Sequence, residues 1–349
     1  MDKPLYNKAD INVLKQKLAK ESTPRTTISF YQYAQIESPV TFRDELYVLL
    51  DELSALGRIY VSTEGVNAQL SVPADKVDEL RTALYTISFL DGVRLNIAVE
   101  YAGESFYKLK IKVKDKIVAD GLDDASFDVT DKGIHVDAEK FNQLADDPET
   151  IIVDMRNHYE SEVGHFKGAI TPDVETFREE LPVVEQMLVD KKDKKLLLYC
   201  TGGIRCEKAS AYYRHKGFEN VYQLEGGIIK YAHDVAEKGL ENKFVGKNFV
   251  FDERMGERIS NEIISSCHQC GAECDTHVNC ANDGCHILFI QCTTCSEKYQ
   301  NTCSVKCMEF NQLPQEKREL LKAQLKFNGN MLGKGRYKAH NKDQQLQLD

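Results

Sequence analysis

The chain has 349 residues and carries 45 lysines and arginines against 55 aspartates and glutamates, which gives a formal net charge of −10. This length exceeds one compact domain and predicts two or three. The negative balance argues against a surface that is basic throughout, although a local basic patch would still allow nucleic-acid binding. No apolar run approaches the roughly 20 residues that span a membrane. The N-terminus also lacks a secretory apolar segment, so we expect a cytoplasmic protein.

Residues 1–125 show the pattern of a separate α+β domain. Strand-like alternation over 26–33 is followed by helical spacing over 43–56, strand character over 58–72 and a second helical stretch over 75–87. Strands over 93–99 and 107–113 complete a β-α-β-β-α-β order, which predicts a ferredoxin-like (acylphosphatase-like) sandwich. The segment from Glu64 to Gln69 is expected at a strand bend, where Gly65 marks a bulge and Asn67 is an ordinary turn residue.

A row of lysines occupies every second position near the end of this domain: Lys108, Lys110, Lys112, Lys114 and Lys116. On a strand they would share one face, opposite Leu109, Ile111 and Val113. One interpretation is a solvated face that guards a sheet edge. The other is a track for a phosphate backbone, with aromatic residues at 106 and 107 close enough to stack on an unpaired base. The candidate RNA-binding residues are Lys108, Lys110, Lys112 and Lys114. An acidic, turn-rich linker follows, with a domain boundary near 125–145.

The second domain is expected over 140–242 and contains the loop Cys200-Thr-Gly-Gly-Ile-Arg205, between an apolar strand over 196–199 and a helix over 207–215. Its two glycines let backbone N–H groups turn inward, while the helix N-terminus and Arg205 add positive charge. These features favour a thiolate, so Cys200 and Arg205 are the predicted catalytic residues, supported by Thr201, Gly202, Gly203 and Ile204. Cys206 is expected to pack in the core, and resolution of an oxidised Cys200 is the alternative.

The segments around this loop carry a wider pattern. A strand over 151–153 ends in Asp154-Met-Arg156, Glu160 precedes Gly164-His165, and a closing Gly217-Phe218 precedes a strand over 221–224 and the turn 225–227. Together with the Cys-x4-Arg loop, which is one residue shorter than the loop of cysteine phosphatases, these segments resemble the rhodanese domain. The one departure is Phe166 in place of the usual isoleucine. The resemblance implies a doubly wound parallel sheet with Cys200 at the carboxyl end of a central strand. Asp154 and Arg156 are expected to form a supporting ion pair.

Nine of the 11 cysteines lie between Cys267 and Cys307, within a third region over 245–312. Short C-x-x-C spacings in a chain that is not secreted favour metal binding over disulfides. One zinc site is predicted at Cys267, Cys270, Cys292 and Cys295, and a second at Cys280, Cys285, Cys303 and Cys307. Cys274 and His277 compete for either site, and an iron–sulfur cluster is the alternative. His268 and His286 are expected to be bystanders. Residues 313–349 are polar and expected to be disordered.

The whole layout resembles the bacterial tRNA uridine(34) hydroxylase family over nearly the full chain. The segments that carry this resemblance are Arg25-Thr-Thr-Ile-Ser-Phe-Tyr, Glu64-Gly-Val-Asn-Ala-Gln, Asp154-Met-Arg-Asn-His-Tyr-Glu, Cys200-Thr-Gly-Gly-Ile-Arg-Cys-Glu-Lys-Ala-Ser and Asn248-Phe-Val-Phe-Asp-Glu-Arg-Met-Gly-Glu-Arg-Ile. The resemblance implies conversion of the wobble uridine of certain tRNAs to 5-hydroxyuridine, with molecular oxygen as co-substrate and Cys200 essential. The expected partner is the tRNA anticodon stem-loop, held in a groove between the first domain and the Cys200 loop.

The residues by themselves leave the reaction open. A thiolate in such a loop can attack sulfur, attack C6 of a uracil ring, or carry a persulfide or a peroxy-type oxygen. One alternative is therefore a rhodanese-type sulfurtransferase that passes a Cys200 persulfide to a tRNA or another acceptor. Another is a non-enzymatic scaffold that binds RNA or protein, against which the intact loop argues. No flavin, haem or iron-triad motif stands out, so no organic cofactor is predicted.

Overall fold

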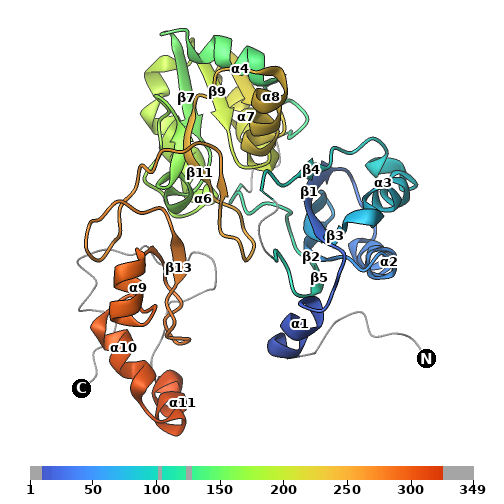
Figure 1. Ribbon diagram of the computed structural model, residues 1–349. Helices are drawn as coiled ribbons and strands as arrows, with labels where there is room; N and C mark the ends of the chain where they lie inside the picture. The colour runs from blue at the N-terminus through green and yellow to red at the C-terminus, as the bar shows by residue number, and fades with distance from the viewer. Residues whose placement is uncertain (1–9, 101–103, 123–127, 325–349) are drawn as a thin grey trace.

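The computed structural model describes residues 10–100, 104–122 and 128–324. Three regions follow one another along the chain: an N-terminal α+β domain, an α/β domain and a cysteine-rich region (Figure 1). Within these described ranges, no helix has the length and apolar character that a membrane crossing requires.

The N-terminal domain is built on a five-stranded sheet with the order β4-β1-β3-β2-β5. Strands β1, β3, β2 and β4 pair antiparallel, and β5 lies parallel to β2 at the edge. This arrangement confirms the predicted ferredoxin-like class and adds a strand to it. The elements are α1 (Ile11–Leu18), β1 (Arg25–Tyr33), α2 (Pro39–Glu52), β2 (Leu56–Ser62), β3 (Gly65–Pro73), η1 (Ala74–Lys76), α3 (Val77–Tyr85), η2 (Ser88–Leu90), β4 (Asn96–Ile97) and β5 (Leu109–Val113).

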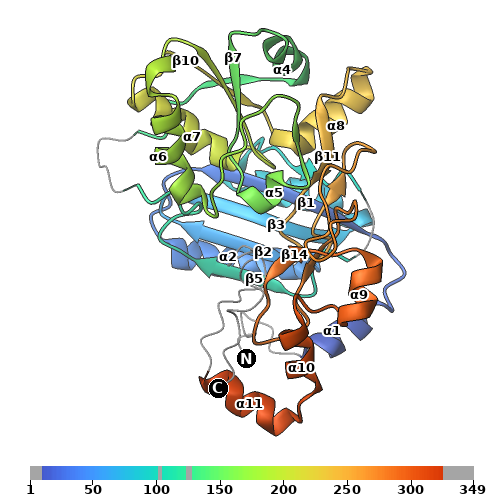
Figure 2. The same cartoon turned by 90° about the vertical axis from the view of Figure 1, so that its left-hand side faces the viewer.

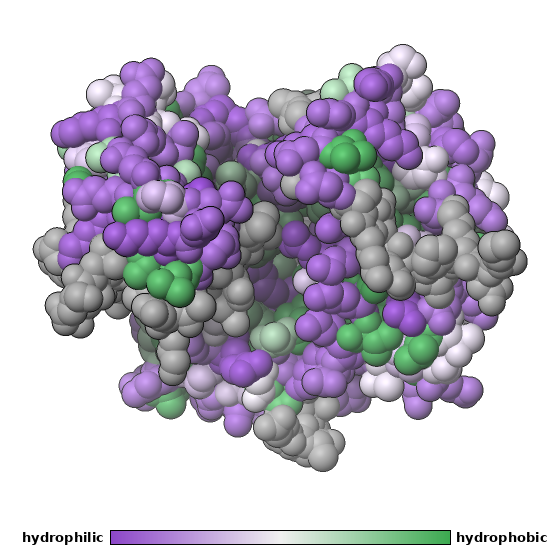
Figure 3. Space-filling view, turned by 90° about the horizontal axis from the view of Figure 1, so that it is seen from below, coloured by the Kyte–Doolittle hydropathy of each residue, from purple (hydrophilic) through white to green (hydrophobic). Residues whose placement is uncertain are grey.

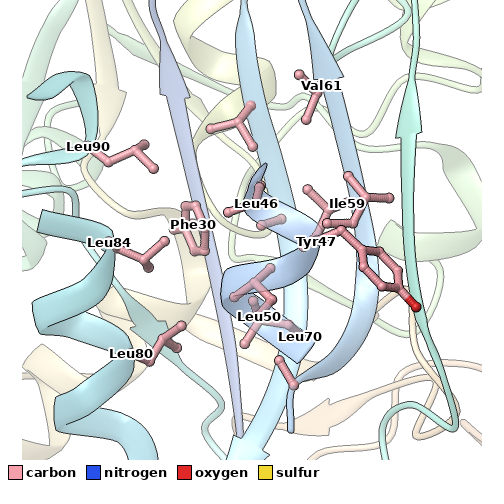
Figure 4. Close-up of a cluster of buried hydrophobic side chains, with 14 of the residues drawn as sticks. Phe30, Leu46, Tyr47, Leu50, Ile59, Val61, Leu70, Leu80, Leu84 and Leu90 are labelled. Carbon is pink, nitrogen blue, oxygen red and sulfur yellow. The ribbon is translucent and has the colours of Figure 1, made fainter. Parts of the chain in front are cut away.

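The two faces of this sheet differ in chemistry because side chains alternate along each strand. One face is apolar and packs under helices α2 and α3, where Phe30, Ile59 and Leu70 meet Leu50 and Leu84 (Figure 4). The other face carries polar side chains from four adjacent strands. Helices of the N-terminal domain cover only the apolar face of the sheet. The polar face is turned toward the α/β domain that follows.

The prediction for the segment from Glu64 to Gln69 was right about a bend at Glu64 and wrong about Asn67. Asn67 is not a turn residue: it lies within β3, paired with Tyr31 of β1 and Tyr60 of β2. The turn is formed by the two residues before β3, and Gly65 starts the strand with φ of +140°. A Cβ at Gly65 would lie 2.0 Å from the carbonyl oxygen of Gln32, so close strand packing requires glycine there.

The second domain holds a parallel sheet in the order β6-β10-β9-β7, with helices on both faces (Figure 1). Helices α6 and α7 pack on one face and α4 and α8 on the other, which confirms the doubly wound prediction. The elements are β6 (Ile134–Val136), α4 (Ala138–Ala145), β7 (Thr150–Asp154), α5 (His158–Ser161), β8 (Gly164–Phe166), α6 (Phe177–Met187), η3 (Val189–Lys191), β9 (Lys195–Tyr199), α7 (Ile204–His215), β10 (Asn220–Leu224) and α8 (Gly227–Lys238).

The third region begins with β11 (Phe244–Asn248), which pairs with β8 and so ties this region to the α/β domain. It continues with β12 (Glu257–Arg258), β13 (His277–Asn279), β14 (Leu288–Ile290), α9 (Thr293–Tyr299), α10 (Val305–Gln312) and α11 (Gln315–Gln324). The expectation of disorder from residue 313 was wrong for α11. Leu313 and Leu321 pack against the apolar cluster around the buried cysteines, which stabilises this otherwise polar helix. Residues 325–349 lie outside the described residues.

A buried lysine joins the first two domains. Lys208 of α7 is 2% exposed, and its ammonium lies 2.8 Å from a carboxylate oxygen of Glu64 in the β2–β3 turn. It also pairs with buried Asp120, in the segment that follows β5. One cation thus neutralises two carboxylates from the other domain, which fixes α7 and the Cys200 loop against the N-terminal sheet.

Replacing Lys208 with alanine should lower the free energy of unfolding by about 3 kcal/mol, the lower end of the range for a broken buried pair, because Glu64 loses its cation while Asp120 keeps Lys116. Chemical denaturation followed by circular dichroism measures this loss. The control is Lys191→Ala, at an exposed position, which should change stability by less than about 0.5 kcal/mol. Equal small effects for the two variants would contradict the role given to Lys208.

Candidate functional site

The Cys200 loop lies where β9 ends and α7 begins, at the carboxyl end of a central strand. Gly203 has φ of +102°, and a Cβ there would lie 2.8 Å from the hydroxyl oxygen of Tyr31. Both facts require glycine at this position. The start of α8 supports the loop from below, since the amide of Ile228 donates to the carbonyl of Cys200 at 3.0 Å. A Cβ at Gly227 would lie 2.5 Å from that same carbonyl oxygen, which explains the closing Gly-Gly turn.

The Cys200 sulfur is fully buried yet surrounded by groups that favour a thiolate. Burial alone would raise its pKa, but the Cys206 side chain, the Arg205 charge and the amides of Cys206 and Gly203 outweigh it and lower the pKa to about 6. The Gly203 amide donates to the sulfur at 3.2 Å. At neutral pH this cysteine is therefore mostly a thiolate.

Arg205 is held by a carboxylate that sequence analysis assigned no role. Its guanidinium donates to both oxygens of Glu160, at 2.6 and 2.8 Å, and Glu160 is fully buried on the short helix α5. The Asn157 amide donates to Glu160 at 3.1 Å and fixes it further. Glu160 belongs to the segment that carried the rhodanese resemblance. The sequence therefore showed its place in the motif, but it did not show that Glu160 binds Arg205.

Asp154 and Arg156 form the predicted ion pair, with two hydrogen bonds of 2.8 and 2.7 Å between the guanidinium and the carboxylate. Both residues are fully buried, and the Tyr199 hydroxyl donates to Asp154 at 2.8 Å. Arg156 also donates to the carbonyl of Gly164 at 2.6 Å. The pair links β7, β8 and β9 beneath the Cys200 loop and lines no part of the cavity above it.

A cavity of about 930 Å³ lies between the Cys200 loop and the polar face of the N-terminal sheet. Figure 2 shows the α/β domain above this sheet, and Figure 3 shows a hollow with hydrophilic residues around it. Cys200, Thr201, Gly202, Ile204 and Arg205 all contribute to the lining. The volume is within the usual range for sites that bind small molecules or single nucleotides.

Strand register arranges the sheet side of the cavity in two rows. One row is Ser29, Gln69, Arg58 and Lys110, and the next is Tyr31, Asn67, Tyr60 and Lys112. Each row runs from the strand nearest the Cys200 loop toward the edge strand. Hydrogen-bonding amides and aromatic rings therefore lie near the thiol, and cations lie farther along the same face.

The cationic end of these rows carries uncompensated charge. Among the described residues, Arg58, Lys110 and Lys112 form no ion pair with a carboxylate, whereas Arg205 and Arg254 do. The pKa of Lys110 is lowered, first by the charge of Lys112 and then by burial. Mutual repulsion of this kind marks a place that an anion would stabilise.

The lysine row is only partly what the sequence predicted. Alternation holds over the first four residues of β5, where Lys110 and Lys112 are exposed and Leu109 and Ile111 are buried, but Val113, predicted to share the buried face, is exposed. Lys108 and Lys114 lie outside β5 and do not line the cavity. Lys116 lies beyond the strand and binds Asp120 at 2.6 Å.

The segment after β11 closes the cavity and was assigned no function from the sequence. Phe251 and Arg254 line it, and Arg254 is held by two hydrogen bonds to Asp252 of 2.8 and 2.6 Å. Arg254 also donates to Glu257 at 2.6 Å. These residues fall in the Asn248–Ile259 segment that carried the family resemblance. That resemblance was the one sign in the sequence that the segment has a function. His286 also lines the cavity, so the cysteine-rich region reaches it.

The eight predicted metal-binding cysteines gather in the two predicted groups of four. In each group all sulfur atoms lie within 4.8 Å of one another. The sulfur atoms of Cys270 and Cys292 lie 3.6 Å apart, and the Cys303 sulfur lies 3.7 Å from those of Cys285 and Cys307. Zn–S bonds of about 2.3 Å in a tetrahedron place sulfur atoms roughly 3.8 Å apart, so both groups fit a zinc ion.

The other candidates of this region lie outside both groups. The Cys274 sulfur accepts from the Thr276 amide at 3.5 Å. His277 is buried against Phe249, and burial lowers its pKa to about 4. His268 binds Glu162 at 2.7 Å.

Comparisons with known proteins give a consistent family assignment. The chain matches the models described as UPF0176 acylphosphatase like domain over 25–117, Rhodanese-like domain over 137–234 and Rhodanase C-terminal over 245–308. A protein of Yersinia pestis named tRNA uridine(34) hydroxylase is 54% identical over 91% of this chain and 90% of its own length. Proteins of the same name from Pectobacterium carotovorum and Photorhabdus laumondii are 52% and 51% identical, over 91% and 96% of this chain and 90% and 95% of their own lengths.

Alkylation of Cys200 should increase as pH rises and reach half its maximum near pH 6, because the thiolate is the reactive form and its pKa is lowered to about 6. Mass spectrometry of the Cys200 peptide after short iodoacetamide pulses measures this profile. The matched control is Cys206, whose pKa burial raises well above the ordinary value, so it should stay unmodified at neutral pH. A half-maximum for Cys200 near pH 9 would contradict the geometry described here.

Purified protein should carry two zinc ions per chain, one for each group of four cysteines. Cys280→Ser should lose one of them, because a fully sulfur-ligated site needs all four thiolates. Elemental analysis by mass spectrometry gives the stoichiometry. Cys274→Ser, which changes a buried cysteine outside both groups, should keep both ions. Iron with acid-labile sulfide in place of zinc would overturn the metal assignment.

Proposed function

The chain belongs to the tRNA uridine(34) hydroxylase family, and on that premise we propose that it converts the wobble uridine of tRNA to 5-hydroxyuridine. Cys200 is the nucleophile in this proposal and molecular oxygen is the co-substrate. The observation that carries it is the cavity itself, which brings a reactive thiolate and a polar, basic sheet face together around one space.

The cavity supports a uracil base as the group that reaches Cys200. A base must leave its stack to enter such a pocket, and single-stranded loops allow this at the lowest energetic cost. Tyr31, Tyr60 and Phe251 offer rings for stacking. Asn67 and Gln69 lie side by side, with the Gln69 amide donating to Asn67 at 2.6 Å, and their remaining donors and acceptors suit the edge of a uracil.

The cations beyond these amides support an RNA backbone as the rest of the ligand. Lys110 and Lys112 lie on the edge strand β5 and Arg58 on its neighbour β2, farther along the same face than the amides. A nucleotide whose base points toward Cys200 would place its neighbouring phosphates near these cations. We therefore assign the anticodon stem-loop to this face, with Lys110 and Lys112 as its contacts.

The lowered pKa of Cys200 suits the first chemical step. Addition of the thiolate to C6 of uracil would make C5 electron-rich and prepare it to accept oxygen. Glu160 would hold the Arg205 guanidinium beside the Cys200 sulfur. Because it is paired in this way, Arg205 would stabilise the thiolate and would not bind a phosphate of the substrate. Asp154 and Arg156 would act only as positioning residues, because they lie beneath the loop and away from the cavity.

Mass spectrometry of tRNA nucleosides from cells that lack this protein distinguishes the proposed reaction from its alternatives. We expect 5-hydroxyuridine and its derivatives to be lost and to return with the wild-type gene but not with Cys200→Ser. Loss of a thiolated nucleoside instead would assign sulfur transfer from a Cys200 persulfide. No change in any nucleoside would overturn both enzymatic readings and leave an RNA-binding or protein-binding scaffold.

Lys110→Glu combined with Lys112→Glu should weaken tRNA binding at low salt and reduce the salt dependence of binding. Each lost phosphate contact lowers the slope of log affinity against log salt by about 0.7–0.9. Fluorescence anisotropy with labelled tRNA at several salt concentrations measures both. The matched control is Lys108→Glu combined with Lys114→Glu, which makes the same change of charge outside the cavity. If all these variants had the same effect, the assigned phosphate contacts would be wrong.

A further inference from the structure

Cys206 is a second cysteine of the catalytic loop, and the function proposed above gives it no role. It lies in the first turn of α7, is fully buried and shares a hydrophobic cluster with Cys200. Against the effect of burial, its side chain and its amide help to lower the pKa of Cys200. Core packing explains its burial but not its place in the same cluster as the reactive thiol.

The two sulfurs differ in their position relative to the cavity and in charge. Cys200 lines the cavity, whereas Cys206 is absent from the lining and lies behind the loop. Burial, followed by the neighbouring Cys200, raises the pKa of Cys206 well above its ordinary value. The pair therefore consists of a thiolate that borders the cavity and a thiol that does not. This is the arrangement of a reactive cysteine and a resolving cysteine.

We propose that Cys206 resolves an oxidised Cys200 in every turnover, so that the two thiols supply the two electrons that hydroxylation by molecular oxygen requires. This inference rests on the proposed function and extends it to the source of the electrons. The oxidised pair is a disulfide, which a small dithiol or a thiol reductase must reduce before the next turnover.

The reaction balances in two steps. In the first, the O–O bond of molecular oxygen breaks: one atom becomes the C5 hydroxyl of the uracil, and the other binds the Cys200 sulfur as a sulfenic acid. The C6–S bond of the initial Cys200 adduct breaks in the same step, and the C5–C6 double bond of the uracil re-forms. The C5 hydrogen and the Cys200 proton end on these two hydroxyl groups. In the second step, the Cys206 sulfur displaces hydroxide from Cys200, and the S–S bond forms. The proton from Cys206 leaves with that hydroxide as water, so uracil gains one oxygen and two sulfurs are oxidised.

The test is a single turnover in air with fully reduced enzyme, freed of small thiols and in excess over unmodified tRNA. For each 5-hydroxyuridine formed, we expect the wild-type enzyme to lose two thiols. Trypsin cuts between Arg205 and Cys206, so the disulfide would join two peptides in mass spectrometry. Product formed while both thiols stay free would overturn the role of Cys206 and leave the hydroxylase function intact. No product at all would reject the hydroxylase function itself.

Variants separate resolution from packing. Cys206→Ser should complete its first turnover and then accumulate a Cys200 sulfenic acid that dimedone traps. Its steady-state rate with added dithiol should fall about tenfold or more, because direct reduction of a buried sulfenic acid is slow. Cys274→Ser, another buried cysteine, should keep both the disulfide and the rate. Undiminished steady-state turnover by Cys206→Ser would contradict the proposal. If that variant does not fold, the thiol count of the wild-type enzyme decides alone.

Discussion

A negative charge on a fully buried sulfur is the constraint on which the rest of this structure depends. Burial by itself would keep Cys200 protonated, so the fold must supply compensation within a few ångströms. It does so with inward-turned amides, the first turn of α7 and the Arg205 cation. Arg205 is itself buried, and Glu160 holds it with two hydrogen bonds. The glycines and the arginine of the loop are therefore explained by the need to stabilise the negative charge on Cys200.

The same requirement connects the two domains. The loop needs glycine at 203 because the Tyr31 hydroxyl of the N-terminal sheet lies against it, and that hydroxyl donates to Glu207 of α7 at 2.9 Å. Lys208, in the next position of α7, binds carboxylates from the other domain. The sheet that meets the loop through Tyr31 also presents the amides of β3 and the cations of β2 and β5 to the cavity. The nucleophile and the surface proposed to hold RNA are therefore parts of one site, although they come from separate domains.

The sequence predicted correctly those features that depend on residues close together along the chain. The Cys200 loop, the parallel sheet and the two groups of four cysteines all follow from short motifs with fixed spacing. It was uninformative where function depends on which faces meet. Asn67 resembled a turn residue because a glycine two positions earlier suggested a bend, and only strand register places it opposite Tyr31 and Tyr60. Helix α11 was missed for a similar reason, since its polar composition hides the leucine that packs on the cysteine cluster.

The most direct test of the central claim uses purified enzyme, unmodified tRNA and oxygen gas labelled with the heavy isotope ¹⁸O. The account predicts that wild-type enzyme produces 5-hydroxyuridine at the wobble position with the label in its new hydroxyl group. Cys200→Ser should bind the same tRNA and form no product. An unlabelled hydroxyl, a sulfur-containing product or full activity of Cys200→Ser would contradict the account.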